Sequence, residues 1–166
     1  MQFFSFENNA IIYLKESDYM KLAFASDHRG YKLKKALINE LEKEKIEIID
    51  CGTFSEESTD YPDYAFKLGE LIKEGQAQYG VAICGSGIGI SIACNKVKGI
   101  RCAKVSTKEE AEVTRNDNNS NVVAFSEKVP KEEALQIVEA FINTPFSTEE
   151  KHKRRVNKIL DYEENN

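Results

Sequence analysis

The sequence predicts an α/β protein: a three-layer α/β/α sandwich around a five-stranded, mainly parallel sheet, with a C-terminal helix. Three observations predict this class. Short apolar runs alternate with longer amphipathic segments from Met20 onward, glycines and prolines interrupt the chain between them, and 166 residues suit one compact domain. Strands and helices that alternate in this way form right-handed parallel crossovers.

Five short apolar runs are the expected strands. They are Lys21–Ser26, Ile46–Ile49, Val81–Cys84, Ile100–Val105 and Asn121–Phe125. The sheet is expected to be Rossmann-like, because a helical segment separates each strand from the next. The expected helices are Tyr31–Glu44, Tyr64–Glu74, Gly87–Val97, Thr107–Thr114, Lys131–Asn143 and Thr148–Tyr162.

Residues 20–166 are expected to form a single domain, with residues 1–19 outside it as a poorly ordered extension or a misassigned start. The apolar stretch Ala10–Leu14 is too short for a signal peptide, and no basic segment precedes it. No apolar run approaches the ~20 residues that a membrane span needs. We therefore expect a cytoplasmic protein that does not bind a membrane.

The charge balance argues against nucleic acid as a partner. The chain has 23 Lys and Arg against 28 Asp and Glu, a net charge of −5, whereas nucleic-acid-binding domains are usually basic. A small or anionic ligand remains open, because a basic pocket can lie inside an acidic protein. Four cysteines without C-x-x-C spacing, and only two histidines, predict neither a metal site nor a cofactor.

The strongest local signal is the segment Cys84–Gly89, which reads Cys-Gly-Ser-Gly-Ile-Gly and follows an expected strand. Ligands bind at the carboxyl ends of parallel strands. Gly85, Gly87 and Gly89 let backbone N–H groups approach an anion closely, either a phosphate or a developing oxyanion. The segment matches neither the dinucleotide-binding pattern nor the P-loop pattern.

Cys84 stands directly before these N–H groups. A helix N-terminus favours the thiolate form of a cysteine, and proton abstraction from carbon needs a base that works near neutral pH. We therefore interpret Cys84 as functional rather than only as the buried end of a strand. Cys51, Cys94 and Cys102 lack this setting and are expected to pack in the core. A redox role for Cys84 is a weaker alternative.

Polar residues elsewhere allow two interpretations each. Asp27 could hold sugar hydroxyls or cap the following helix, and we weigh these evenly. His28, at the same strand end, could meet a phosphate or relay a proton. Lys151 and Arg155 are four residues apart on an expected helix, so both could grip one phosphate, although a solvated charged face is the default interpretation of this segment in isolation.

Together these residues resemble the ribose-5-phosphate isomerase type B family, which also contains galactose-6-phosphate and allose-6-phosphate isomerases. The resemblance covers residues from Met20 to Ile159. The motifs that carry it are Ala25–His28, Ser58–Pro62, Ile83–Ala93, Asn95-Lys96, Gly99–Arg101, Asn118–Val122 and Arg155-Val156.

The resemblance implies a metal-independent isomerase of the pentose phosphate pathway that interconverts ribose 5-phosphate and ribulose 5-phosphate through an enediol(ate). It implies that Cys84 is the base and that Ser86 and the amides of Gly85–Gly89 cradle the enediolate oxygen. The substrate-binding positions it implies are Asp27, His28, Tyr61, Gly85, Gly87, Ile88, Gly89, Asn118, Lys128, Lys151 and Arg155. It also implies a homodimer or homotetramer in which neighbouring subunits complete each site.

Three departures from the family pattern bear on the substrate. Asp117 stands where the family has the histidine that opens the furanose ring, Lys128 and Lys151 stand where it has arginine, and Thr148–Glu150 replaces a Gly-Gly pair. Asp117 is then the expected ring-opening group. Two alternatives remain open: an isomerase of another sugar phosphate (four-carbon, allose or galactose), or a non-catalytic sugar-phosphate-binding subunit.

Overall fold

The computed structural model describes the backbone of residues 4–7, 10–13 and 19–166, and the side chains of residues 19–166. Its central feature is a five-stranded sheet in the order β4-β3-β5-β7-β6, in which every neighbouring pair is parallel. The predicted sheet is thus confirmed. Its strands are β3 (Met20–Ser26), β4 (Ile46–Asp50), β5 (Tyr79–Cys84), β6 (Cys102–Lys104) and β7 (Val122–Ser126).

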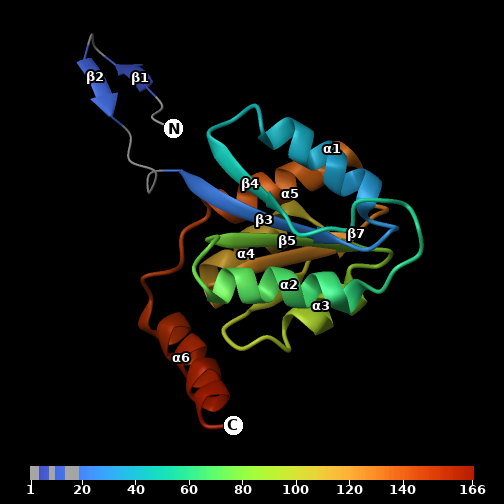
Figure 1. Cartoon of the computed structure of the whole chain (residues 1–166). Coiled ribbons are helices and arrows are strands. Elements are labelled where there is room, and N and C mark those ends of the chain that lie inside the picture. The colour runs from blue at the N-terminus through green and yellow to red at the C-terminus, as the bar shows by residue number, and fades with distance from the viewer. Residues whose placement is uncertain (1–3, 8–9, 14–18) are drawn as a thin grey trace.

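Helices cover both faces of this sheet (Figure 1). One apolar cluster joins the sheet to residues of α1, α4 and α5, and a second joins the opposite face to α2 and α3. The helices are α1 (Tyr31–Leu41), α2 (Tyr61–Lys73), α3 (Ile88–Cys94), α4 (Lys108–Asn118), α5 (Lys131–Asn143) and α6 (Glu150–Glu164).

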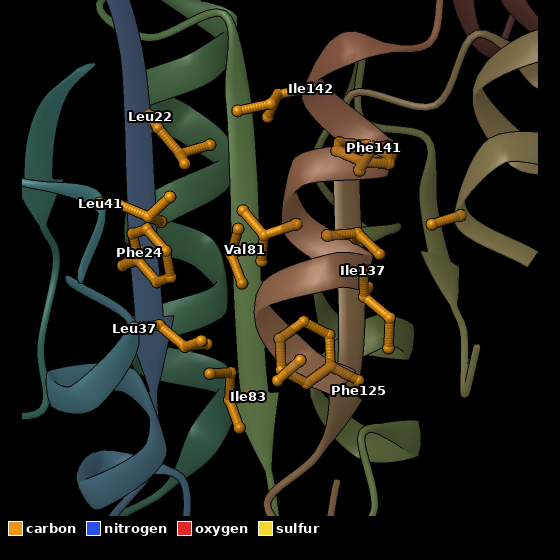
Figure 2. Close-up of a cluster of buried hydrophobic side chains, with 14 of the residues drawn as sticks. Leu22, Phe24, Leu37, Leu41, Val81, Ile83, Phe125, Ile137, Phe141 and Ile142 are labelled. Atoms are coloured by element: carbon orange, nitrogen blue, oxygen red, sulfur yellow. The ribbon is translucent and has the colours of Figure 1, made fainter. Parts of the chain in front are cut away.

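Side-chain alternation along the strands decides which face each residue serves. Phe24, Val81 and Phe125 point toward α1 and α5, where Figure 2 shows them among leucine and isoleucine side chains. Their neighbours on the other face are small, for example Ala82 and Cys84, which belong to the α2–α3 cluster. The Cys84 side chain therefore lies on the face that α3 covers.

Several helix boundaries differ from the prediction; α1 and α3, for example, each end three residues earlier than expected. Helix α2 begins at Tyr61 rather than three residues later, because Pro62 has the φ angle that the first helical turn requires. Helix α4 continues past Thr114 to Asn118. Its end is set by Asn119, which adopts the left-handed conformation (φ 48°) that glycine usually supplies after a helix.

Two ion pairs link elements around the α1 face. The Lys34 side chain of α1 is completely buried; its Nζ pairs with Asp50 and donates to the Thr53 carbonyl at 2.8 Å. Burial lowers the pKa of Lys34 in spite of this pairing. On the surface, Lys43 and then Lys131 of α5 hold the pKa of Glu40 at about 2 by hydrogen bonds to its carboxylate.

Near the N-terminus, β1 (Phe4–Glu7) and β2 (Ala10–Tyr13) pair antiparallel, in a region where the sequence predicts no strand. Figure 1 shows this pair apart from the five-stranded sheet. The remaining positions of the extension, 1–3, 8–9 and 14–18, lie outside the described residues. The division into residues 1–19 and 20–166 stays a prediction. Among the described residues, no helix has the length and apolar character to cross a membrane.

Candidate active site

The Cys84–Gly89 segment forms a tight turn between β5 and α3. Gly87 has a φ of 76°, and a Cβ at this position would lie 2.6 Å from the Phe125 backbone carbonyl carbon. A side chain is therefore excluded there by both backbone conformation and space. The turn aims two N–H groups at side chains: Gly87 donates to Cys84 Sγ at 3.2 Å, and Ile88 donates to Ser86 Oγ at 3.1 Å.

The Cys84 thiol lies at the floor of this turn. The residue is 4% exposed, so the sulfur is shielded from bulk solvent. A backbone N–H that points at sulfur stabilises negative charge on it. Ser86 and Ile88 are exposed, and Gly85 and Gly89 are half-buried. The turn therefore combines a sulfur with an N–H donor and two accessible positions where an anionic oxygen could bind.

Asp27 and His28 lie beside this turn, at the end of β3. Asp27 is buried, and its Oδ1 accepts the N–H groups of Arg29 and Gly30 at 3.0 Å each. These bonds hold the turn that leads into α1, whose N-cap is Gly30 and has no side-chain capping bond. His28 is half-buried, and the Thr59 N–H donates to its Nδ1 at 3.2 Å. The Thr59 carbonyl oxygen lies 3.3 Å from the same Nδ1, so this nitrogen accepts from Thr59 in one tautomer and donates to it in the other.

Tyr61 and Lys128 complete the residues at this edge of the sheet. The Tyr61 ring lies over Gly89, where a Cβ would come within 2.7 Å of its Cζ. Lys128 is exposed in the loop that follows β7, and its N–H donates to Ser126 Oγ at 3.1 Å. The carboxyl ends of β3, β5 and β7 thus gather ten of the predicted positions: Asp27, His28, Tyr61, Cys84, Gly85, Ser86, Gly87, Ile88, Gly89 and Lys128.

Four predicted positions lie at the opposite edge of the sheet: Asp117, Asn118, Lys151 and Arg155. Within a single chain, Lys151 and Arg155 therefore lie away from the edge that carries Cys84. Helix α4 runs back along the sheet from the end of β6, so its last turn reaches the strand beginnings, where Asn121 accepts the Gly80 N–H at 2.9 Å. Four residues of strand, about 13 Å, separate Gly80 from Cys84.

The start of α6 is fastened to this opposite edge. The Ser147 N–H donates to the Asn116 carbonyl at 3.0 Å, and Figure 1 shows α6 on the side where β3 begins. Asn118 lines a cavity of about 880 Å³ together with Ile159 and Tyr162 of α6. None of the residues gathered around Cys84 lines that cavity. One chain thus carries two separate groups of site residues.

His152 is a residue at this edge that the sequence interpretation did not single out. It is 7% exposed, and its Nε2 lies 3.7 Å from Oδ1 of Asp117. Asn116 Nδ2 also donates to this oxygen, at 2.7 Å. An imidazole next to a carboxylate can both give and take a proton. The basic segment around His152 was a visible signal, because the chain has only two histidines.

Arg29 and Glu127 are two further residues that were missed, at the Cys84 edge. Arg29 Nε and Nη2 donate to Glu127 Oε1 at 2.8 and 2.5 Å. The hydrogen bonds and charge of Glu127 raise the pKa of Arg29. The two residues are 98 positions apart, so no local pattern indicates the pair.

The other three cysteines are placed as packing residues. Cys51 and Cys94 are buried and Cys102 is half-buried. Burial raises the pKa of Cys51 to about 11, and a hydrogen bond with Cys94, reinforced by burial, raises that of Cys102 well above its usual value. Across residues 19–166, no three His, Cys, Asp or Glu side chains gather as metal ligands would.

These observations define a class of protein. A parallel α/β/α sandwich with a sulfur beneath a glycine-lined turn, bordered by histidine, tyrosine and lysine, is suited to a small ligand that carries or develops negative charge.

The comparisons give the family. The chain belongs to the ribose-5-phosphate isomerase B family and is an isomerase of the sugar-phosphate class: residues 22–159 match the ribose/galactose isomerase family. It is similar to ribose-5-phosphate isomerase B of Escherichia coli, at 39% identity over 145 residues, which cover 87% of this chain and 97% of that protein.

Two solved structures show the same fold. Ribose-5-phosphate isomerase B of Clostridium thermocellum aligns with a TM-score of 0.85 at 41% identity, over 88% of this chain and 99% of that one. The Mycoplasma genitalium enzyme, solved with bound ribulose-5-phosphate, aligns with a TM-score of 0.82 at 33% identity, over 89% and 98% of the two chains. The predicted family and the α/β sandwich are confirmed.

Proposed function

We propose that this protein interconverts ribose 5-phosphate and ribulose 5-phosphate through an enediolate, with Cys84 as the base. The observation that carries the proposal is the Gly87 N–H directed at Cys84 Sγ, within a turn that also exposes Ser86 and Ile88. The ribulose-5-phosphate held by the Mycoplasma genitalium relative supports a five-carbon substrate.

The chemistry follows from this arrangement. The Cys84 thiolate takes the proton from C2 of the open-chain aldose, and the electrons of the C–H bond form the C1–C2 double bond while the C1 carbonyl oxygen becomes an anion. Ser86 and the amides of Gly85–Gly89 stabilise that oxygen. A proton moves from the C2 hydroxyl to O1, and the Cys84 thiol returns its proton to C1, which gives the ketose and regenerates the thiolate. The steps require neither a metal nor a cofactor.

Ring opening and phosphate binding fall to the second group of residues. Asp117, next to the buried His152, is proposed to move the proton of the ring hydroxyl, because the imidazole gives the carboxylate a partner for proton exchange. Asn118, Lys151 and Arg155 are proposed to bind the far end of the substrate and its phosphate. Lys128 adds positive charge from the Cys84 edge.

The two groups can meet in one site only if two chains combine them. We therefore propose a homodimer, alone or within a homotetramer, in which the Cys84 edge of one subunit faces the Asp117 edge of the other. Exposed apolar pairs support such an interface: Ile88 and Ile92 on α3 are 55% and 57% exposed, and Ile159 and Tyr162 on α6 are 51% and 73% exposed. A reducing cytoplasm would keep Cys84 a free thiol.

A second candidate is isomerisation of a four-carbon sugar phosphate. Asp117 favours it, because such a substrate cannot close a furanose ring and needs no ring-opening acid. Allose and galactose phosphates and a non-catalytic binding role are the remaining alternatives. A purified-protein panel of aldose phosphates separates them: a preference for erythrose 4-phosphate over ribose 5-phosphate would reject the main proposal.

The base is tested separately with Cys84→Ala and Cys84→Ser. We expect both variants to bind substrate and to lose turnover by at least about a thousandfold, the order of effect seen when a central catalytic group is removed. Undiminished isomerisation by Cys84→Ala would show that the sulfur is not the base. Cys51→Ala is the matched control, since Cys51 is equally buried but lies at the end of β4.

A further inference from the structure

Arg29 occupies a place at the Cys84 edge to which the proposed mechanism gives no role. Its side chain is 53% exposed, yet it lies over the turn rather than in open solvent. A Cβ on Gly85 would come within 3.3 Å of both Cδ and Nε of Arg29. The guanidinium therefore lies against the first glycine of the turn that holds the sulfur.

Glu127 fixes the guanidinium in this place. The Glu127 N–H donates to the Cys84 carbonyl at 2.9 Å, and the preceding Ser126 Oγ donates to the Gly85 carbonyl at 2.7 Å. The loop after β7 is thus attached to the turn by its backbone. Because the Glu127 side chain is only 25% exposed, it is a firm acceptor for the two Arg29 donors.

The charges around Cys84 make the position of Arg29 important. Asp27 lies on the β3 side and Glu127 on the β7 side, so two carboxylates flank the turn, while Lys128 is exposed further along the same loop. His28 binds the Thr59 backbone, and the α2 and α3 residues nearest the turn, Tyr61 and Ile88, carry no charge at neutral pH. Glu127 first, and then Asp27 and Cys84, raise the pKa of Arg29.

We propose that Arg29, tethered by Glu127, is a positioning residue of this site: its guanidinium offsets the flanking carboxylates and stabilises negative charge on the Cys84 sulfur and on the enediolate oxygen above Gly85. The effect on the enediolate oxygen rests on the proposed isomerase function, whereas the effect on the sulfur does not. Within the described residues Arg29 Nη1 makes no hydrogen bond, so one face of the fork is available to a developing oxyanion.

The first experiment measures the sulfur without any substrate. The Cys84-containing peptide is quantified by mass spectrometry after iodoacetamide labelling at pH 7, in wild type, Arg29→Ala, Arg29→Lys and Glu127→Gln. We expect Arg29→Ala to slow labelling about tenfold, because about tenfold less of the sulfur is then present as thiolate at pH 7. The curve of labelling rate against pH should move to higher pH. Arg29→Lys should recover most of the rate, and Glu127→Gln should label no more slowly than wild type.

A purely structural pair predicts a different pattern. If Arg29 and Glu127 only tied two loops together, either substitution would loosen the turn and speed labelling to the same extent. Equal effects of Arg29→Ala and Glu127→Gln, or no effect of Arg29→Ala, would overturn the proposal. Lys32→Ala is the matched control, because Lys32 in the first turn of α1 pairs with a different carboxylate, Glu56, at 2.7 Å and its side chain is 80% exposed.

The second experiment uses turnover of ribose 5-phosphate. We expect Arg29→Ala to lower kcat about tenfold with little change in KM, less than the 10²–10³ of a buried oxyanion donor because Arg29 is half exposed and paired. A raised KM with unchanged kcat would assign Arg29 to substrate binding and overturn the positioning role. If the wild type does not isomerise this sugar, the proposed function fails, while the labelling result still decides the effect on sulfur.

Discussion

Replacing Gly87 by alanine tests how closely the turn above Cys84 is fitted to the sheet. Gly87 combines a φ of 76° with a backbone neighbour, and a new Cβ would lie 2.6 Å from the Phe125 carbonyl carbon and 2.8 Å from its Cα. Gly75 has almost the same φ, 75°, but nothing lies within 4 Å of its Cβ position. The two glycines therefore separate conformational strain from collision.

The expected magnitudes follow from this difference. A non-glycine residue in the left-handed region costs about 1–2 kcal/mol, so Gly75→Ala should lower the free energy of unfolding by that amount. Gly87→Ala should cost a further ~1–3 kcal/mol, because two backbone segments must separate as in an overpacked core. It should also move the N–H that points at Cys84 Sγ, and turnover should fall about 10²-fold or more.

Urea denaturation of both variants and steady-state kinetics of ribose 5-phosphate isomerisation make the comparison. Gly75→Ala should keep wild-type kcat, since it lies after α2 and far from the turn. Equal losses of unfolding free energy in the two variants would show that the Phe125 backbone moves aside easily. The close contact between Gly87 and Phe125 would then not limit stability. Full turnover by Gly87→Ala would reject the role of the turn in catalysis.

Three further predictions concern charge. Lys34→Met should lower the free energy of unfolding by about 3 kcal/mol, because it leaves Asp50 without its buried partner; an unchanged urea midpoint would contradict this. Glu40 has a folded-state pKa of about 2, below its unfolded value of about 4.3, so it stabilises the fold above pH ~4.5 and loses this effect as the pH falls toward 2. Glu40→Gln should therefore lose less stability than wild type across that range, and parallel thermal-melting curves would refute the sign. Arg155→Ala should raise the KM for sugar phosphates strongly while folding normally, and a wild-type KM would remove Arg155 from the phosphate site.

The strands and the glycine turn were predictable because their signals are local. Apolar runs locate β3, β5 and β7 within a residue or two, and glycine spacing locates the turn after Cys84. The fourth predicted strand, Ile100–Val105, is shorter in the structure and spans only Cys102–Lys104. The Ile100 N–H donates to the Val97 carbonyl and the Arg101 N–H donates to Asn121 Oδ1, so both bond outside the strand pairing. The end of α4 was missed because Asn119 carries out the function of a glycine there.

The distribution of the site over two edges was harder to predict. Which edge a residue occupies depends on the direction of the helix that carries it, and α4 and α6 bring Asp117 and Arg155 to the strand beginnings. The Arg29–Glu127 pair joins loops almost a hundred residues apart, and single residues of either type look like ordinary surface charges. Long-range pairs of this kind depend on the sheet order, which puts β3 and β7 on either side of β5.

The separation of Cys84 from Arg155 within one chain has a genetic consequence. If every working centre borrows its parts from two copies, a chain lacking the sulfur and a chain lacking the arginine can rescue each other. When Cys84→Ala and Arg155→Ala chains are mixed, refolded and paired at random, half of the dimers should be hybrids with one intact centre and one doubly defective one. At a substrate concentration far below the raised KM of Arg155→Ala, where both parents turn over little substrate, the mixture should show about a quarter of wild-type activity.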